Sequence, residues 1–431
     1  MPTCLAFAMS LAAGKAELSS CTHVTKEAQA MLQEAAAPPI RPVTIGAGDK
    51  KTKVGGETVL FRHEKRFENP PGIALLLRDS LPEAELSGRL ERFQNLRYLR
   101  VGLSLHPELV AVKSETGDTQ KFIALINKAK QYSDGNLILM SQNPDVLTAG
   151  IRVSADRKPL LYAANKDNVD RMISLAKENA CPLAVKGQNL EELAVLTDRI
   201  TKAGVNDLVI DPGSRGLKQA FEDEVKIRTA ALNKKFRPLG FPTIVFPCEM
   251  TDNPMKEALI SSIFIAKYGG IIVMSDFRGE SLFPLLVERF NIYTDPQRPL
   301  ATTEGIYEIG SPNKDSPVLL TSNFSLTYFI VSGEIETSRI PCYLLVKDTE
   351  GLSVMTSWAA GKFVADTIAP FVKKCGIADK VSHRRLVIPG YIASEAGGLE
   401  EELVGWEVTV GPREAAHIPA FLKNWKQKEA K

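Results

Sequence analysis

The 431-residue chain has few cysteines and almost no excess charge, and each shortage excludes a class of protein. Its six scattered cysteines are too few for a disulfide framework, which indicates a reducing, cytoplasmic setting. Lys and Arg together number 53 and Asp and Glu 51, giving a formal charge of +2. The chain therefore has no overall field that would attract nucleic acid or an anionic membrane.

Long apolar runs are also lacking, and the best candidate for a targeting or spanning segment is Thr3 to Ala13. This run contains a cysteine, has no basic segment before it, and is followed directly by Gly14 and Lys15. A membrane-spanning helix needs about 20 apolar residues. We therefore predict neither a signal peptide nor a transmembrane segment.

The sequence does have enough apolar side chains for buried cores, since 44% of residues are hydrophobic and 24% are charged. Its length predicts two or three domains, because a domain usually takes about 100 to 200 residues. Residues 1–37 have the pattern of two short helices, which Pro38 and Pro39 stop. Residues 38–72 are rich in turns and offer brief strands such as Thr58 to Arg62. We predict a small helical module followed by a linker with a hairpin.

From residue 73 to residue 300, short runs of Val, Ile and Leu alternate with segments of helical period. The runs are Ile73 to Leu77, Leu109 to Val112, Leu137 to Met140, Leu160 to Ala163, Leu183 to Val185, Leu208 to Ile210, Thr243 to Phe246 and Ile271 to Met274. Their number and spacing are typical of an α/β fold, the (β/α)8 TIM barrel, which we predict for residues 73–300. Tyr98 to Leu103 is also strand-like, and either displaces the second run or pairs with it as an extra strand.

Polar residues follow the predicted barrel strands, where the active sites of barrel enzymes lie. They include Arg78, Asp79, Glu115, Asn165, Lys186, Asp211, Glu249 and Asp276. Because every such barrel has polar residues at its strand ends, this position alone is weak evidence of catalysis.

Residues 301–431 show a βαβαβ pattern, with strands predicted at Ser316 to Tyr328, Tyr343 to Val346, Arg385 to Ile388 and Trp406 to Val410. Turn-forming residues follow the last three of these strands. In an open parallel sheet, ligands bind outside the carboxyl ends of the strands, near helix N-termini. We therefore expect a binding pocket at those turns.

Hydroxyl and amide side chains are concentrated in the segment TSNFSLTY, residues 321–328, where apolar residues separate them. The turn at Thr349 to Gly351, followed by a helix that opens at Ser353 to Thr356, offers free backbone N–H groups, and Gly411 to Ala415 forms a third turn. The residues alone leave two interpretations open. Either these segments bind a ligand, or they are a half-exposed edge strand and glycines that close βα turns.

Cys4 and Cys21 flank sixteen residues near the start of the chain. Two thiolates cannot hold a cubane cluster, which needs four. Taken alone, the pair is best interpreted as two helical cysteines without function, since free cysteine often behaves as a small buried apolar residue. Cys181, Cys248, Cys342 and Cys375 lack metal-ligand spacing and are expected to be packing residues.

Several long strings change this interpretation, because they resemble one known family along nearly the whole chain. PTCLAFAMSLAAGKAELSSC, residues 2–21, resembles the second half of the cluster-binding segment in the large (gamma) subunit of the corrinoid iron-sulfur protein of the acetyl-CoA decarbonylase/synthase (Wood-Ljungdahl) pathway. Further strings of the same family are DRKPLLYAAN at 156–165, YTDP at 293–296, SPVLLTSNFSLTYF at 316–329, DTEGLSVMTSWAAGKF at 348–363 and GWEVTVGPREA at 405–415.

The resemblance implies a fold of three parts. These are a helical iron-sulfur module, of which residues 1–37 are a remnant, a TIM barrel, and a Rossmann-like corrinoid-binding domain at 301–431. In the family a C-x-x-C pair precedes the cysteine matched by Cys4, and this sequence begins with Met1 where an internal residue is expected. We therefore expect Cys4 and Cys21 to be the last two metal ligands of a truncated [4Fe-4S] site.

The resemblance further implies a methyl carrier rather than a self-contained enzyme. The cobalt of a bound cobamide accepts a methyl group from methyltetrahydrofolate on a separate methyltransferase and donates it to acetyl-CoA synthase. The implied partners are the small subunit, which completes a heterodimer, the methyltransferase, the synthase and a corrinoid reductive activator. The family assigns the large subunit's barrel no reaction, which makes this barrel a scaffold and docking surface.

With the resemblance, the cofactor interpretation of the C-terminal turns is favoured. No catalytic side chain is expected, because the reactive centre belongs to the cofactor. The expected cofactor-binding residues are Thr321, Asn323, Ser325, Thr327, Tyr328, Gly351, Ser353, Val354, Met355, Thr356, Pro389, Gly390, Gly411, Pro412, Arg413 and Ala415.

The histidines indicate how the cobalt is ligated. Many cobalamin enzymes present a histidine from a D-x-H-x-x-G motif to the lower face of the metal. None of the five histidines, His23, His63, His106, His383 and His417, has the aspartate two residues before it and the glycine three residues after it. We therefore expect a base-off, histidine-off cobamide.

Two other functions remain open. One is a barrel methyltransferase that acts on a pterin and carries the C-terminal domain as an accessory module. The other is a scaffold subunit without cofactor, which the missing cysteines keep open.

The cysteine pattern gives a direct prediction about metal content. Because only two of four cluster ligands are present, we expect the purified polypeptide to contain no iron-sulfur cluster. Iron and acid-labile sulfide are to be determined on the same sample. Four equivalents of each per chain would contradict the prediction.

Overall fold

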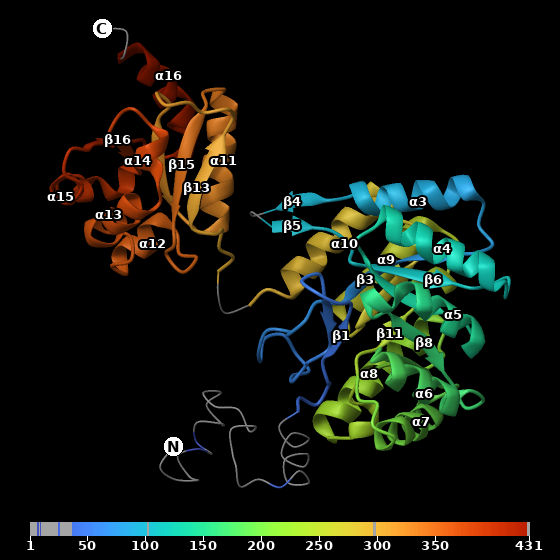
Figure 1. Cartoon of the computed structure of the whole chain (residues 1–431). Helices are drawn as coiled ribbons and strands as arrows, with labels where there is room; N and C mark the ends of the chain where they lie inside the picture. Colours follow the sequence, from blue (N-terminus) through green and yellow to red (C-terminus); the bar gives the residue numbers. More distant parts are fainter. Residues whose placement is uncertain are drawn as a thin grey trace. The chain divides into compact units, whose positions relative to one another are not determined.

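The computed structural model describes residues 37–100, 103–295 and 299–428, together with the isolated positions 7, 9 and 25. Cys4 and Cys21, and the two helices predicted around them, lie outside the described residues. The chain divides into two compact units (Figure 1). The first runs up to Leu60 and covers Phe67–Leu96 and Pro107–Tyr293, and the second takes Phe61–Arg66, Arg97–His106 and the chain from Thr294. None of the described helices is both long and apolar enough to cross a bilayer.

The first unit contains one sheet of eight parallel strands, in the order β10-β9-β8-β7-β6-β3-β12-β11. A parallel bridge between Ile210 and Thr243 joins the two end strands, so the barrel is nearly closed. The strands are β3 (Gly72–Arg78), β6 (Leu109–Lys113), β7 (Asn136–Met140), β8 (Leu160–Ala164), β9 (Leu183–Lys186), β10 (Leu208–Asp211), β11 (Ile244–Val245) and β12 (Ile271–Met274). All eight predicted runs form barrel strands, which confirms the barrel.

The strand-like segment at Tyr98 to Leu103 neither displaces nor extends the barrel sheet. Its described residues form a separate antiparallel pair, β4 (Tyr98–Arg100) with β5 (Leu103–Leu105). Leu99 and Leu103 are exposed there, whereas the first four of the five residues of β6 are buried. The burial of the strand at Leu109 explains why that run, and not the earlier one, belongs to the barrel.

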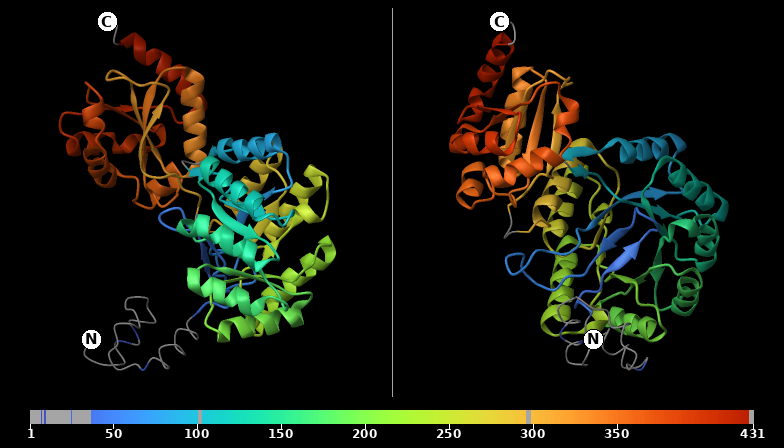
Figure 2. Two further views of the ribbon diagram at one scale, coloured as in Figure 1. Left: turned by 45° about the vertical axis from the view of Figure 1, so that its right-hand side comes forward. Right: turned by 60° about the vertical axis from the view of Figure 1, so that its left-hand side comes forward.

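Helices surround the barrel strands (Figure 2). They are α3 (Glu83–Asn95), α4 (Thr119–Tyr132), α5 (Pro144–Ser154), α6 (Val169–Asn179), α7 (Leu190–Lys202), α8 (Leu217–Asn233), α9 (Pro254–Ala266) and α10 (Gly279–Ile292). Short polar side chains start several of them. Asp118, Asn143, Asn189 and Asn253 accept hydrogen bonds from backbone N–H groups of the first turns that have no partner within the helix.

A hairpin closes the amino-terminal end of the barrel. Its strands are β1 (Val43–Ile45) and β2 (Thr52–Val54), whose apolar side chains join the core cluster inside the barrel. Asn136, at the start of β7, donates hydrogen bonds to the Lys50 carbonyl at 2.7 Å and to the Thr52 hydroxyl at 2.8 Å. A brief strand was predicted at Thr58 to Arg62, but those residues form no strand. The three-residue strands were too short to recognise by alternation.

The second unit contains a five-stranded sheet in the order β13-β15-β14-β16-β17. The strands β14 (Val318–Ser322), β15 (Cys342–Lys347), β16 (Arg385–Ile388) and β17 (Glu407–Val410) are parallel, and β13 (Gly305–Ile309) adds an antiparallel edge that the sequence did not reveal. The helices are α11 (Ser325–Ser338), α12 (Val354–Ala359), α13 (Ala365–Lys374), α14 (Ile377–Lys380), α15 (Ala396–Glu402) and α16 (Ile418–Lys428).

Helices cover both faces of this sheet, as parallel sheets require. Alternate strand residues point to opposite faces and build two apolar clusters. In β14, Val318 and Leu320 pack in the cluster that includes α13, while Leu319 packs in the one that includes α11 and α16.

The predicted strand from Ser316 to Tyr328 was too long. It ends at Ser322, and Ser325 begins helix α11. Tyr328, Val331 and Ile335 lie three and four residues apart and meet the same apolar cluster against the sheet. Their helical spacing overrides the strand preference of the hydroxyl-rich segment before them.

Glu224, on α8, is a deeply buried acid, with 1% of its surface exposed. Its Oε2 accepts a hydrogen bond from the Thr243 hydroxyl at 2.8 Å, while Oε1 has no hydrogen-bond partner. Burial raises the pKa of the Glu224 carboxyl to about 8, and the Thr243 hydrogen bond and the nearby Arg228 only partly oppose it. The folded protein therefore keeps a proton there that the unfolded chain releases near its ordinary value of 4.5.

This pKa predicts a pH dependence of stability. Between pH values of about 4.5 and 8 the folded state binds more protons than the unfolded state, so the free energy of unfolding falls as pH rises. Glu224→Gln removes this contribution, which has a maximum slope of about 1.4 kcal/mol per pH unit. The barrel transition in urea, followed by circular dichroism at several pH values, should then depend less on pH. Glu222→Gln, on the exposed face of α8, is the matched control. Equal pH slopes in parent and Glu224→Gln would contradict the prediction.

Candidate functional site

A cleft of about 310 Å³ opens in the second unit at the carboxyl ends of β14, β16 and β17. Its lining residues are Leu319, Leu320, Thr321, Thr327, Ile330, Val331, Ser353, Val354, Met355, Val387, Ile388, Pro389, Tyr391, Gly411, Pro412, Arg413, Glu414, Ala415 and Ile418. The floor is apolar and comes from the strands, whereas the polar groups stand on the turns and on α11.

The strand order explains why a cleft forms here. After β14 the chain crosses to β15 on one side, and after β15 it crosses to β16 on the other side. The connections therefore diverge beside β14, and such a switch point leaves a crevice at the carboxyl edge of a parallel sheet. The pocket lies at the edge that the sequence analysis predicted.

Two of the turns at the cleft approach each other closely. The Gly390 N–H donates to the Pro412 carbonyl at 3.1 Å, and the Gly411 N–H donates to the Ile388 carbonyl at 2.8 Å. A Cβ on Gly390 would come within 2.6 Å of the Gly411 carbonyl oxygen, so only glycine fits. The Tyr391 hydroxyl donates to Glu414 at 2.6 Å and ties the rims of the two turns together.

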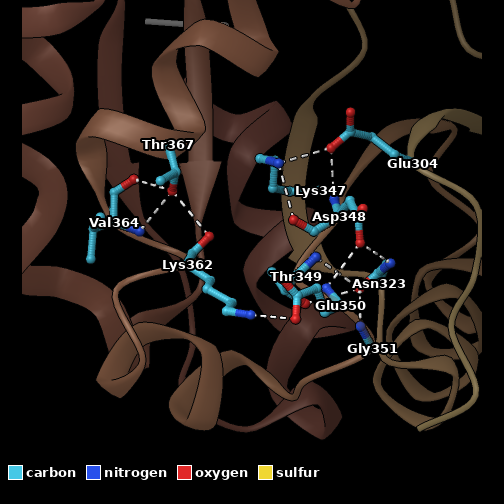
Figure 3. Close-up of polar contacts among 10 residues, drawn as sticks. All are labelled: Glu304, Asn323, Lys347, Asp348, Thr349, Glu350, Gly351, Lys362, Val364 and Thr367. Carbon is cyan, nitrogen blue, oxygen red and sulfur yellow. Dashed lines mark hydrogen bonds and ion pairs between the residues drawn. The ribbon is translucent and has the colours of Figure 1, made fainter. Parts of the chain in front are cut away.

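Asn323 fixes the turn between β15 and α12 (Figure 3). Its Oδ1 accepts hydrogen bonds from Thr349 N at 3.0 Å, from the Thr349 hydroxyl at 2.9 Å and from Gly351 N at 2.9 Å. Its Nδ2 donates to Asp348 at 2.8 Å. Asn323 is 3% exposed. This buried amide thus holds the turn that leads to Ser353 and Val354 in the cleft wall.

A second group of polar contacts supports the same turn from outside. Lys347 pairs with Glu304 at 3.0 Å, and Glu304 also accepts from the Asp348 N–H at 2.7 Å. Lys362 forms an ion pair with Glu350 (Figure 3). Glu350 and Gly351 have φ values of +58° and +75°, a conformation that favours glycine at the second position.

The structure brings ten of the sixteen predicted cofactor-binding residues to the cleft. These are Thr321, Thr327, Ser353, Val354, Met355, Pro389, Gly411, Pro412, Arg413 and Ala415.

The other six predicted residues lie behind the wall or beside it. Asn323, Gly351 and Gly390 shape the turns, as described above. The Thr356 hydroxyl pairs with that of Ser353 at 3.0 Å, Ser325 is buried at the start of α11, and Tyr328 packs against Tyr307.

Sequence reasoning missed the apolar half of the cleft and its acidic rim. The missed lining residues are Leu319, Leu320, Ile330, Val331, Val387, Ile388, Tyr391, Glu414 and Ile418. The helical spacing of Thr327, Ile330 and Val331 on α11 was the signal that could have found part of them, and reading this segment as a strand concealed it.

Three hydroxyls at the end of β14 and the start of α11 are buried without a partner. The side-chain oxygens of Thr321, Ser322 and Ser325 form no hydrogen bond with any described residue. Thr321 lines the cleft, whereas Ser322 and Ser325 do not. A buried hydroxyl without a partner costs about 1 to 3 kcal/mol, so Thr321 carries an unused hydrogen-bonding group at the cleft.

None of the four histidines of this unit, His63, His106, His383 and His417, lines the cleft. His383 uses both ring nitrogens elsewhere: Nε2 lies 3.0 Å from the Ser316 carbonyl, and Nδ1 accepts from Arg385 N at 3.2 Å. His417 lies on the exposed turn before α16.

Among the described residues, no group of three or more His, Cys, Asp or Glu side chains is placed to hold a metal ion. Cys181, Cys248 and Cys342 are buried and Cys375 is half-buried, as expected for packing residues. Burial raises the pKa of the Cys248 and Cys342 thiols to about 12, which keeps them protonated.

Residues 42–422 match the family model described as CO dehydrogenase/acetyl-CoA synthase delta subunit. The chain belongs to this family. A relative from Moorella thermoacetica, named corrinoid/iron-sulfur protein large subunit, is 46% identical over 98% of this chain and 94% of its own length. The acetyl-CoA decarbonylase/synthase complex subunit gamma of Methanopyrus kandleri is 37% identical over 98% of this chain and 93% of its own length. These matches confirm the family membership that the sequence strings indicated.

The hydrogen bonds of Asn323 predict its contribution to stability. Asn323→Ala leaves the Thr349 N–H and hydroxyl and the Gly351 N–H buried without their acceptor, and we expect a loss of roughly 2 to 4 kcal/mol. Urea unfolding followed by tryptophan fluorescence measures this unit alone, because all three tryptophans, Trp358, Trp406 and Trp425, lie in it. Asn424→Ala, at an exposed position of α16, should change stability by less than about 0.5 kcal/mol. If the two variants unfold at the same urea concentration, Asn323 does not have the role described.

Proposed function

We propose that the chain is the corrinoid-carrying subunit of a methyl-transfer system and that the cleft of its second unit holds the cofactor. The cofactor would be a cobamide in its base-off form. The observation that carries the proposal is the cleft itself, whose apolar floor, polar turns and unpaired Thr321 hydroxyl suit part of a large, mostly apolar macrocycle fringed with amides. The name of the Moorella relative, corrinoid/iron-sulfur protein large subunit, supports the same cofactor class.

Each part of the cleft has a role in this proposal. Leu320, Val387 and Ile388 form a floor that excludes water from an apolar surface. The Thr321 hydroxyl offers a hydrogen bond to an amide. Arg413, exposed at the cleft mouth, has no ion pair or hydrogen bond with described residues and is free to meet a phosphate group.

The cofactor would supply the methyl-carrying chemistry, through cobalt that accepts the group from methyltetrahydrofolate on a methyltransferase and gives it to acetyl-CoA synthase. The protein contributes position and ligation. None of the histidines in the described residues lines the cleft, and His383 has both ring nitrogens engaged elsewhere. This arrangement supports the histidine-off state.

The architecture of the second unit supports a Rossmann-like assignment. Four parallel strands, in the sequential order second, first, third and fourth, carry helices on both faces, and the cleft lies at their switch point. A partial iron-sulfur module at residues 1–37, with Cys4 and Cys21 as the last two ligands of a truncated site that holds no cluster, remains part of the proposal.

Exposed apolar side chains surround the cleft. Leu326 and Ile330 on α11, Met355 on α12 and Tyr391 leave large parts of their surface uncovered in this chain. Such a rim around a binding site is typical of a surface that a partner covers. We propose that the small subunit of the heterodimer docks here. The methyltransferase, the synthase and the reductive activator are the further partners of the proposal.

Thr321 gives an experiment that separates cofactor binding from folding. Thr321→Val removes a buried hydroxyl without a partner, so the cofactor-free chain should become more stable by about 1 kcal/mol. The same change should weaken cobamide binding roughly tenfold, because the bound cofactor loses a hydrogen bond. Ser322→Ala is the matched control. It removes the neighbouring unpaired hydroxyl, which does not line the cleft, and should stabilise the chain without changing the affinity.

Stability is measured by tryptophan fluorescence in urea, and affinity by the absorbance of bound cobamide in the presence of the small subunit. Absence of bound cobamide in the parent heterodimer would refute the proposal and favour a scaffold without cofactor. Turnover of methyltetrahydrofolate by the chain alone would instead support a barrel methyltransferase. Equal affinities of parent and Thr321→Val would remove Thr321 from the site.

A further inference from the structure

Besides the cleft of the second unit, the protein has a cavity of about 650 Å³ in the first unit, at the carboxyl ends of the barrel strands. Its lining residues come from β6, β7, β8 and β9 and from the loops that follow β10 and β11. Five of these lining residues are Lys113, Tyr162, Lys186, Arg215 and Glu249. Nothing in the proposed function uses this cavity, which lies wholly within the barrel unit.

The top layer inside the barrel is charged where the layers below are apolar. Ala111 on β6, Ala184 on β9 and Val209 on β10 belong to the core cluster inside the barrel. Because strand residues two apart share a face, the next inward positions are Lys113, Lys186 and Asp211. These strands thus end in charged side chains instead of continuing the apolar core, and Lys113 and Lys186 line the cavity.

Asp211 is the centre of a buried polar network and is 1% exposed. The Tyr162 hydroxyl donates to its Oδ2 at 2.5 Å, and Arg215 donates to both of its oxygens, at 2.8 and 3.1 Å. The Arg215 Nε donates to Glu249 at 2.5 Å, and the guanidinium lies 4.5 Å from the centre of the Phe246 ring. Burial and the Asp211 charge raise the pKa of the Tyr162 hydroxyl well above 10, so Tyr162 stays a neutral donor.

Filling the end of a barrel with such a network costs more free energy than filling it with apolar side chains. Desolvation costs several kcal/mol for each buried ion, and well-packed apolar residues are often as stable. The network holds Arg215 and Glu249 in one fixed arrangement at the cavity wall. A rigid, pre-oriented set of donors and acceptors is what a specific binding site needs.

The charges of the network balance, and one cation remains. Arg78 pairs with Glu115 at 3.4 Å, Lys113 lies 3.6 Å from both Glu115 and Glu249, and Arg215 pairs with Asp211 and Glu249. Three cations thus meet three carboxylates. Lys186 is the fourth cation of this inner layer and is half-buried, and its ammonium group has no ion pair or hydrogen bond with a described residue. The other charged lining residues are Lys166 and Asp167, which are exposed, and Glu192, which is half-buried.

We propose that the barrel cavity binds a small metabolite through an oxyanion group, which meets the Lys186 ammonium. The shared chemistry is a carboxylate or a phosphate, and Glu249 and Glu115 offer acceptors to hydroxyl or N–H groups elsewhere on the same molecule. The size of the cavity excludes a macromolecule and suits a ligand of small-metabolite size. The barrel is then a binding unit in its own right, beyond its role as a scaffold.

The test is calorimetric titration of the full chain with acetate, succinate and orthophosphate, with ionic strength held constant by sodium chloride. We expect saturable binding of one equivalent of at least one probe, and the carboxylate and phosphate arms distinguish the two anion classes. Lys186→Met should weaken that binding roughly tenfold to a hundredfold. Lys202→Met, at a surface lysine of α7 paired with Asp198, should leave the affinity unchanged.

A second measurement does not depend on a stable variant. Acetylation of the parent chain by an N-hydroxysuccinimide ester, read by mass spectrometry, should be slowed at Lys186 by the bound probe and not at Lys202. The proposal is overturned if no probe saturates below about 10 millimolar. It is also overturned if Lys186→Met keeps the parent affinity, or if the probe leaves Lys186 as reactive as before.

Discussion

Both candidate sites depend on one constraint of parallel sheets, which is that the carboxyl ends of all strands meet at the same edge. In the second unit this edge joins the turns after β14, β16 and β17 into one cleft, although they lie far apart in the sequence. In the first unit the same constraint brings Lys113, Lys186 and Asp211 to one end of the barrel. The hydrogen-bonded register of neighbouring strands decides which side chains meet, and the loops then supply the variable polar groups.

The two units use buried polar groups in different ways. The amide oxygen of Asn323 accepts three hydrogen bonds from the turn after β15. Its burial therefore stabilises one backbone conformation of that turn. Thr321, two residues earlier, has a buried hydroxyl without a partner. Asn323 fixes the conformation of a turn in the cleft wall, whereas Thr321 leaves an unpaired hydroxyl beside the cleft. A sequence shows only that both are polar residues in the same short segment.

The sequence was sufficient for the barrel because each of its strands is a continuous apolar run bounded by helical segments, a pattern that follows from burial on both faces. It was insufficient for short elements such as β1 and β2, whose three residues carry no measurable alternation. The segment after Ser322 was misread because its hydroxyls favour strands locally, whereas the packing of Tyr328, Val331 and Ile335 on the sheet requires a helix. In the cleft, residues on turns were predictable from Gly, Pro and hydroxyl signals. The apolar floor was not, because its residues are indistinguishable from ordinary core until the switch point is known.

The hairpin that closes the amino-terminal end of the barrel prevents a ligand from passing through the barrel. Because Val43, Ile45 and Val54 pack inside it, the barrel is closed at one end and is not a channel. Any molecule that enters from the charged end has to leave by the same opening, because the apolar core and the hairpin lie beneath the charged layer. An asymmetric ligand that binds this layer through its charged group therefore keeps its remaining part toward the opening.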